Sequence, residues 1–307
     1  MFKALVLLIA LTTGAPTAAA ADDVPWSVST AANSFGSDRQ NYSYTVNPGG
    51  QVEDGLVVVN RGKTPLELAV YAADAYTTDN GRLDLLTPDT KSTGVGAWVH
   101  ADRDGMKVAP GQSVQVPFTI NVPADAKPGD HLGGIVTSLK RGTDVDRRLA
   151  IRIRLRVSGD LKPSLSVDDL KVRYTGNRNA TVTYTVHNNG NAILAARPST
   201  SVAGPFGSWR VESGQEDSPQ LLPGETWKTS TQVHGVTPAL RLTGTVTLTP
   251  LLTDAAGSTG PLNPIASTTH AWSIPWWVIP ALVALVVVLL LVARRIRSRA
   301  VTAGRRR

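Results

Sequence analysis

The sequence predicts an all-β fold class, made of two tandem immunoglobulin-like β-sandwiches plus one C-terminal transmembrane α-helix. Three observations predict it. Short β-branched runs alternate with turns that use many of the 27 Gly and 20 Pro residues, which is typical of strands joined by tight turns. The chain has no cysteine, so a hydrophobic core alone must hold each domain together. One long uncharged run near the C-terminus is long enough to cross a membrane.

The first residues have the layout of a secretory signal. Lys3 precedes an apolar run that ends at Leu11, and Ala18-x-Ala20 offers a small-residue cleavage site. A second membrane helix is excluded because the apolar run is too short. We therefore expect residues 1–21 to be a signal peptide and the mature chain to be exported.

Residues 22–158 are predicted to form the first sandwich. Asn-Pro-Gly, Asn-Gly and Pro-Gly steps mark its turns, because glycine and asparagine tolerate the backbone conformations that tight turns need. Strands are expected at 26–29, 40–46, 52–60, 66–73, 97–100, 106–108, 114–122, 132–139 and 148–157.

The last of these strands alternates most cleanly, with leucine, isoleucine and valine on one face and a ladder of arginines on the other. Arg152, Arg154 and Arg156 belong to this ladder. Guanidinium groups match the carboxylates or phosphates of a wall polymer, so the ladder is a candidate binding surface. The alternative, which we favour, is a solvated outer face that resists edge-to-edge aggregation.

Residues 159–252 are predicted to form a second sandwich, with strands at 165–174, 180–188, 193–198, 207–211, 226–233 and 242–249. A faint internal repeat links the two halves. A strand ends in Asn60 in the first half and in Asn188 in the second, and a Pro-Gly step precedes a later strand in each. Residues 253–273, rich in Gly, Pro, Ser and Thr, are expected to form a stalk.

The run Ile274–Ala293 is the predicted membrane anchor, with Trp276 and Trp277 placed as an interfacial belt. A buried core helix is the alternative, but the run shows no polar face. The arginine-rich residues 294–307 predict a cytoplasmic tail, since positive charge marks the inner side. The expected location is the bacterial plasma membrane, crossed once, with the N-terminal part extracytoplasmic and the anchor in contact with the lipid bilayer.

The charge distribution argues against nucleic acid as a partner. The whole chain carries a net charge of +7, but seven of its 31 Lys and Arg residues lie after Ala293, and all 24 Asp and Glu residues lie before it. The part between the signal peptide and the anchor is therefore close to neutral and has no basic field to hold a polyanion.

No catalytic chemistry is apparent. The five histidines are far apart and none has metal-ligand spacing, so we expect no metal and no cofactor. No serine or cysteine nucleophile motif is present. The protein is therefore predicted not to be an enzyme.

The first module resembles a known family through an ordered set of short motifs. These are Gln40-Asn41-x-Ser43-Tyr44, Asn47-Pro48-Gly49, Leu56 to Asn60, Thr77-Thr78-x-Asn80-Gly81, Trp98-Val99, Val108-x-Pro110-Gly111, Val122-Pro123 and Gly129-x-x-x-Gly133-Gly134-Ile135. In this order they resemble the peptidoglycan-binding domain of WxL-interacting proteins. The resemblance implies peptidoglycan binding by the first module and WxL-domain proteins as partners. No tryptophan here is followed by x-Leu, so the chain resembles the receptor and not the WxL-domain protein that the receptor binds.

The sequence thus predicts a non-catalytic, membrane-anchored cell-surface protein that binds peptidoglycan and a partner surface protein. Sugar rings need aromatic faces, and carboxylates need amides and guanidiniums. The candidate ligand-binding residues are Gln40, Asn41, Tyr42, Tyr44, Trp98, Arg152, Arg154 and Arg156. The alternative function is a chaperone-like or assembly scaffold that captures a partner strand at an exposed sheet edge.

Overall fold

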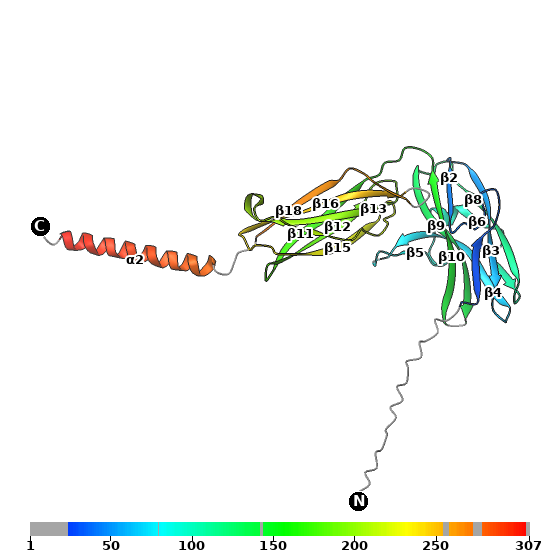
Figure 1. Ribbon diagram of the computed structural model, residues 1–307, viewed down its shortest axis with the longest axis horizontal. Coiled ribbons are helices and arrows are strands. Elements are labelled where there is room, and N and C mark those ends of the chain that lie inside the picture. Colours follow the sequence, from blue (N-terminus) through cyan, green and yellow to red (C-terminus); the bar gives the residue numbers. More distant parts are fainter. Residues whose placement is uncertain (1–23, 79, 142–143, 254–257, 273–277, 305–307) are drawn as a thin grey trace, which may run out of the picture.

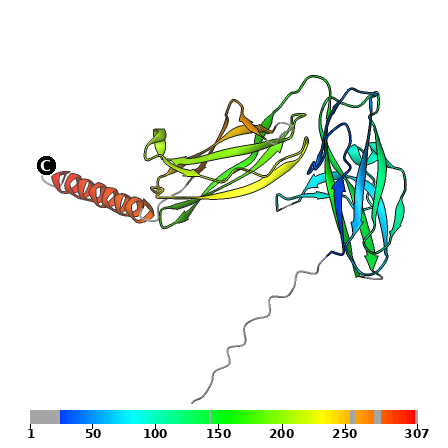
Figure 2. The same ribbon diagram turned by 45° about the vertical axis from the view of Figure 1, so that its right-hand side comes forward.

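The computed structural model describes residues 24–304 except 79, 142–143, 254–257 and 273–277. Two β-modules meet at a bend, and one long helix lies beyond the second module (Figure 1). The turned view shows the same two modules, with the strands of the first running across the end of the second (Figure 2). The predicted signal peptide lies outside the described residues.

The first module packs two sheets face to face, with strand orders β1-β3-β8-β6 and β2-β10-β9-β4-β5, and β7 also pairs with β4. Its elements are β1 (Trp26–Thr30), β2 (Tyr42–Val46), β3 (Gln51–Asn60), β4 (Leu66–Thr77), β5 (Leu83–Leu85), α1 (Val95–Trp98), β6 (Val99–Ala101), β7 (Gly105–Val108), β8 (Ser113–Asn121), β9 (Gly129–Arg141) and β10 (Asp144–Val157).

Strict alternation builds this core. In β2 the residues Tyr42, Tyr44 and Val46 are buried and the two between them are exposed, as expected for a strand with one face on the core. Trp26 of β1 donates its indole N–H to the Thr137 hydroxyl of β9 at 2.8 Å, so the buried polar atom of that large ring is paired. The first and last thirds of the module are thereby joined across the core.

The second module is also a sandwich, with strand orders β11-β12-β15 and β14-β13-β16-β17, and β18 also pairs with β16. Its elements are β11 (Leu165–Gly176), β12 (Asn179–Asn188), β13 (Leu194–Ala203), a 3-10 turn (Pro205–Gly207), β14 (Val211–Gly214), β15 (Thr226–His234), β16 (Arg241–Thr253), β17 (Thr259–Pro261) and β18 (Ile265–Trp272).

Two sequence predictions in this module are wrong. The described part of the predicted stalk, residues 258–272, is built into the module: β17 and β18 both pair with β16, and β18 alternates half-buried and exposed side chains along its length. Residues 254–257 and 273 of the predicted stalk lie outside the described residues. The prediction was wrong because the uncharged, Gly-, Pro-, Ser- and Thr-rich composition of this segment is typical of a linker. The alternation of β-branched residues in the same segment is typical of a strand. The strand expected at 207–211 is largely a turn, because residues 205–207 form the 3-10 turn and β14 begins only at Val211.

The faint sequence repeat is confirmed at the level of individual hydrogen bonds. Asn60 is fully buried; its amide donates to two carbonyl oxygens at 2.8 and 2.9 Å and its side-chain oxygen accepts from Gly62 N–H at 2.8 Å. Asn188 makes the same three contacts in the second module, at 2.8, 2.9 and 3.1 Å. The glycine of each Pro-Gly step, Gly111 or Gly224, donates its N–H to the backbone oxygen of the corresponding asparagine. In both modules, therefore, the same arrangement of hydrogen bonds around a buried asparagine holds a turn against a later strand.

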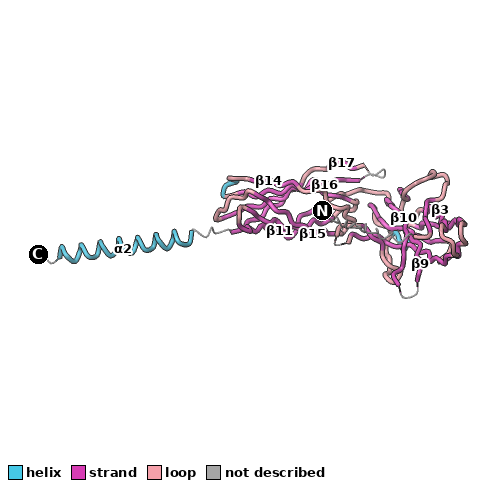
Figure 3. The backbone as a smooth tube through the Cα atoms, turned by 60° about the horizontal axis from the view of Figure 1, so that its bottom comes forward, coloured by secondary structure: helices cyan, strands magenta, loops and turns pink. Residues whose placement is uncertain are grey.

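The helix α2 (Val278–Gly304) corrects the predicted anchor. Among the described residues, no helix combines the length and hydropathy that a membrane crossing requires. Residues 274–277 of the predicted span lie outside the described residues. The transmembrane helix and the single-pass plasma-membrane location that rested on it are therefore wrong, as is the bilayer contact through Ile274–Ala293. The helix is separate from both strand-built modules in the tube view (Figure 3).

Candidate functional site

The most distinctive surface feature of the first module is an incompletely paired edge on β10. On one side β9 pairs with β10 from Asp144 to Val157. On the other side β2 pairs with it in parallel, but only from Ile153 to Val157. Residues 148–152 therefore pair with no strand on that side among the described residues, although β1 of the facing sheet lies near β10. Every second residue of such an edge directs its backbone N–H and C=O outward, where another chain can pair with them.

The edge stays open because the chain between β1 and β2 is held away from it. Asp54 of β3 accepts two hydrogen bonds from the Arg39 guanidinium at 2.7 and 3.0 Å, one from the Tyr44 hydroxyl at 2.5 Å and one from Asn33 at 2.7 Å. The Asp54 side chain is fully buried and that of Arg39 is 16% exposed. This cluster fixes residues 33–39 at the other sheet, so β2 can begin only at Tyr42.

The charges of this cluster are strongly coupled. Burial alone would raise the pKa of Asp54, but the hydrogen bonds from Arg39, Tyr44 and the backbone lower that pKa below its usual value. The pKa values of Tyr42 and Tyr44 are raised well above the usual range, chiefly because burial disfavours the phenolate. The carboxylate is therefore ionised and both tyrosines are neutral at neutral pH.

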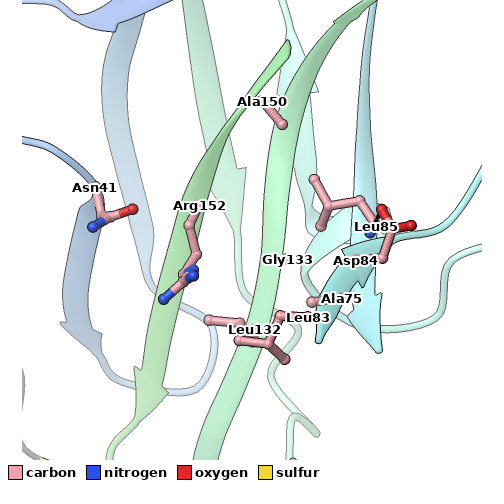
Figure 4. Close-up of a pocket in the computed structure, with 9 residues that line it drawn as sticks. All are labelled: Asn41, Ala75, Leu83, Asp84, Leu85, Leu132, Gly133, Ala150 and Arg152. Atoms are coloured by element: carbon pink, nitrogen blue, oxygen red, sulfur yellow. Dashed lines mark hydrogen bonds between the residues drawn. The ribbon is translucent and has the colours of Figure 1, made fainter. Parts of the chain in front are cut away.

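A pocket of about 270 Å³ adjoins the open edge on the outer face of the sheet. Its floor and apolar wall come from Leu132, Gly133 and Ala150 and from the short strand β5, while Arg152 and Asn41 stand on the side of the open edge (Figure 4). Arg152 and Asp84 supply one cation and one anion at opposite sides. Arg152 is exposed, and no described residue forms a hydrogen bond or ion pair with its side chain. The pocket can therefore hold a side chain that combines an apolar part with a polar end.

The wall formed by β5 packs over a glycine of β9. A Cβ atom at Gly134 would lie 2.7 Å from a methyl carbon of Leu85 and 3.0 Å from the Ile151 carbonyl oxygen, so the glycine leaves room for the Leu85 side chain against the sheet. Arg148 of β10 then donates to the Leu85 carbonyl oxygen at 3.3 Å and lies 3.8 Å from the Asp84 carboxylate. These contacts hold the pocket wall against β10.

The pocket also borders the junction between the modules. Leu132, Ile193 and Leu222 form a small buried cluster there, with Ala75 and Leu83 packed against it. The fully buried Asp130 side chain accepts hydrogen bonds from Arg156 at 2.7 and 2.9 Å, from Arg154 at 3.3 Å and from the Ile193 backbone N–H of the second module at 3.0 Å. Burial opposes ionisation of Asp130, but these bonds lower its pKa. The junction therefore fixes the second module beside the pocket.

The structure separates the sequence-predicted site residues into three groups. Asn41 and Arg152 line the same pocket, and Gln40 is exposed next to Asn41. Arg154 and Arg156 belong to the junction between the modules. Tyr42, Tyr44 and Trp98 are 0%, 7% and 9% exposed and belong to the core of the first module.

The core position of these three aromatic side chains corrects the wall-binding prediction. A platform for sugar rings needs an aromatic face open to solvent, yet the Tyr42 hydroxyl donates to the Gly55 carbonyl oxygen inside the protein, and the Trp98 ring packs against His131 with ring centroids 4.8 Å apart. The prediction of a peptidoglycan-binding surface built on these residues is therefore wrong.

Sequence reasoning missed the other half of the pocket. Leu83, Asp84 and Leu85 come from β5, a strand of three residues that is too short to show a period. The Gly133-Gly134 step lies within the strand expected at 132–139 and within the family motif. A glycine pair inside a strand signals the close approach of another segment, and this signal could have located the wall.

The remaining titratable groups do not form a metal centre. Within the part of the chain that the structure describes, no three His, Asp or Glu side chains come together as metal ligands. Asp74 of β4 accepts hydrogen bonds from the backbone N–H groups of Thr93, Gly94 and Gly96 at 2.7 to 2.8 Å and so holds the start of α1.

Comparison with known proteins gives a likeness in fold only. No protein-family model and no curated protein matches the sequence. Similar solved structures include a chaperone–tip adhesin complex of CFA/I fimbriae, with 9% identity over 82% of this chain and 100% of that chain and a TM-score of 0.41. The class 5 fimbriae chaperone CfaA has 9% identity over 81% and 100% of the two chains and a TM-score of 0.38. The E. coli chaperone DraB has 12% identity over 80% and 97% and a TM-score of 0.36.

A likeness of this size concerns the arrangement of strands and carries no argument about function. Because no family model matches, the resemblance to WxL-interacting proteins stays a prediction, and no finding supports peptidoglycan as a partner.

Proposed function

We propose that this protein is a non-catalytic binding protein that holds an extended segment of a partner protein by adding it as a strand to the open edge of β10. The observation that carries this proposal is the mismatch in pairing: β9 covers β10 over its whole length, whereas β2 covers only residues 153–157. Strand addition satisfies outward backbone groups that water otherwise solvates, and it gives affinity without requiring a particular partner sequence.

The neighbouring surfaces supply selectivity. Alternate side chains of an added strand point to opposite faces of the sheet. Those on the outer face would meet Ala150, Arg152 and the pocket, and those on the inner face would meet Leu149, which is half-buried at the margin of the core. A segment that alternates small or apolar residues, with a carboxylate or amide near Arg152, fits this surface best.

Four other edge strands of the protein are less suited to this role. In the second module β11 and β18 lie beside each other, so each covers the approach to the other. A bulge between Asp168 and Lys171 also interrupts the edge of β11, with Asp169 at a φ of 52°. The strands β5 and β6 span three residues each and offer few backbone groups.

The test uses the full chain and a photo-reactive phenylalanine analogue at Ala150, on the open edge. The matched control carries the analogue at Arg210, an exposed residue of the second module. We expect the Ala150 position alone to cross-link the partner that co-purifies from the source cells. In the purified complex, the backbone amides of residues 148–152 should exchange hydrogen more slowly than in the free protein, and R152E should weaken the complex more than R210E.

Two results would contradict the proposal. One is equal cross-linking from Ala150 and Arg210. The other is a complex in which the amides of residues 148–152 exchange as fast as in the free chain, because a paired strand must protect them.

A further inference from the structure

The outer face of one sheet in the second module is a polar surface that the proposed strand addition does not use. On the strands β11, β12 and β15, cross-strand pairing aligns side chains in rows: Arg173 with Thr181 and Gln232, Lys171 with Thr183 and Ser230, and Asp168 with Thr185 and Lys228. Between these rows lies a groove of about 660 Å³. It is larger than the pocket beside β10.

The groups in the groove are available to a ligand. Lys171, Arg173 and Lys228 are exposed, and none forms an ion pair with a described residue. The hydroxyls of Thr181, Thr183 and Thr185 likewise form no hydrogen bond with another described residue. This contrasts with the arginines of β10, most of which are paired within the protein.

The charge in the groove is polarised along the strands. Two carboxylates, Asp168 and Asp169, lie at one end, where His187 is 3.5 Å from Asp168. The three cations lie beside and beyond them. An anion therefore binds best over Lys171 and Arg173, away from the carboxylate end.

The lining also indicates what kind of anion fits. No aromatic side chain lines the groove, so nucleic-acid bases would find no surface on which to stack. Along a strand, outward side chains repeat at about 6.7 Å, and neighbouring strands lie about 4.8 Å apart. A lattice of hydroxyl groups with interspersed cations at this spacing can hydrogen-bond the hydroxyls of a sugar chain while it neutralises that chain's acidic groups.

From these observations we infer that the groove lined by Lys171, Arg173, Lys228 and the three threonines binds an acidic polysaccharide. The ligand class is a chain of sugars that carries carboxylates. This site lies on a different module from the open edge of β10, so the two can be tested independently.

The experiment measures binding of the full chain to polygalacturonate, with dextran as the neutral polymer and polyphosphate as a sugar-free polyanion. The test variant carries K171Q and R173Q. The matched control carries K162Q and R241Q, which remove the same charge from exposed positions of this module outside the groove. We expect the test variant to bind polygalacturonate roughly tenfold more weakly, about threefold for each cation removed, and the control to bind like the unchanged protein.

A third variant, T183V, keeps the charge and the strand but removes the central hydroxyl. It should weaken polygalacturonate binding and leave the binding of polyphosphate unchanged. The proposal is overturned if the test variant and its control bind equally well, if dextran binds as tightly as polygalacturonate, or if polyphosphate binds as tightly or more tightly. Thermal unfolding of each variant verifies that the module remains folded.

Discussion

The junction between the modules offers a sharp test of the structure, because the protein contains the same ion-pair geometry in two environments. Arg156 meets Asp130 through two hydrogen bonds of 2.7 and 2.9 Å, and Arg197 meets Asp217 through two of 2.9 Å. The Asp130 side chain is 0% exposed, whereas that of Asp217 is 42% exposed. The two pairs therefore differ in burial, and Asp130 has two additional partners, Arg154 and the Ile193 N–H.

We predict that D130N destabilises the protein by about 2 to 3 kcal/mol. Breaking a buried pair costs about 3 to 5 kcal/mol when a charge is left uncompensated. Arg154 and Arg156 are 15% and 30% exposed and can turn partly toward water, which reduces that cost. The N–H of Ile193 can still donate to the remaining amide oxygen. D217N should change stability little, because exposed ion pairs contribute little.

The assay combines denaturant unfolding with a distance measurement between the modules. The chain has no cysteine, so spin labels can be attached at K107C and R241C, one on each module. D130N should lower the unfolding midpoint and broaden the distance distribution, while D217N should leave both unchanged. Equal shifts of the midpoint in the two variants, or an unbroadened distribution in D130N, would refute the reasoning that the buried carboxylate fixes the junction.

Three further predictions follow from other parts of the fold. N60A and N188A should each cost about 3 kcal/mol in the free energy of unfolding, because each leaves buried backbone groups without a partner; a loss in only one module would contradict their equivalence. F206G should stabilise the protein by about 0.5 to 1 kcal/mol in thermal unfolding, since Phe206 has a φ of 58° and is fully exposed, so no packing is lost. Stability should fall below about pH 4, because Asp54 and Asp130 have lowered pKa values in the folded state and the unfolded chain takes up protons first. Above that pH their contribution is complete, and D54N should flatten the acid limb of a stability-versus-pH curve.

Much of the strand pattern could be predicted from the sequence, because alternation is a local property. In β2, β3, β8 and β12, the order of apolar and polar residues along the strand indicates which face is buried. The equivalence of Asn60 and Asn188 was also visible, since each follows a strand and each is matched by a later Pro-Gly step. In contrast, β5 and β18 were missed, one because it is too short and the other because its composition resembles a linker.

The candidate site was only partly predictable. Residue type indicated Asn41 and Arg152. The same criterion also selected Tyr42, Tyr44 and Trp98, because the sequence does not distinguish an aromatic side chain that faces the core from one that faces a ligand. Tyr42 was assigned to the surface, and only its contacts with β3 and β8 place it in the core.

The sequence by itself determined an all-β composition, the positions of most strands and a two-fold repetition of one turn device, because these depend on neighbouring residues. Tertiary structure alone decided that β2 stops short along β10, that three short segments meet as a pocket, and that Arg154 and Arg156 join the modules. Each of these depends on register between residues far apart in the chain, such as Trp26 and Thr137, which are 111 positions apart. Local periodicity specifies which residues share a face but not which strand lies beside it, and the open edge of β10 is a property of that pairing.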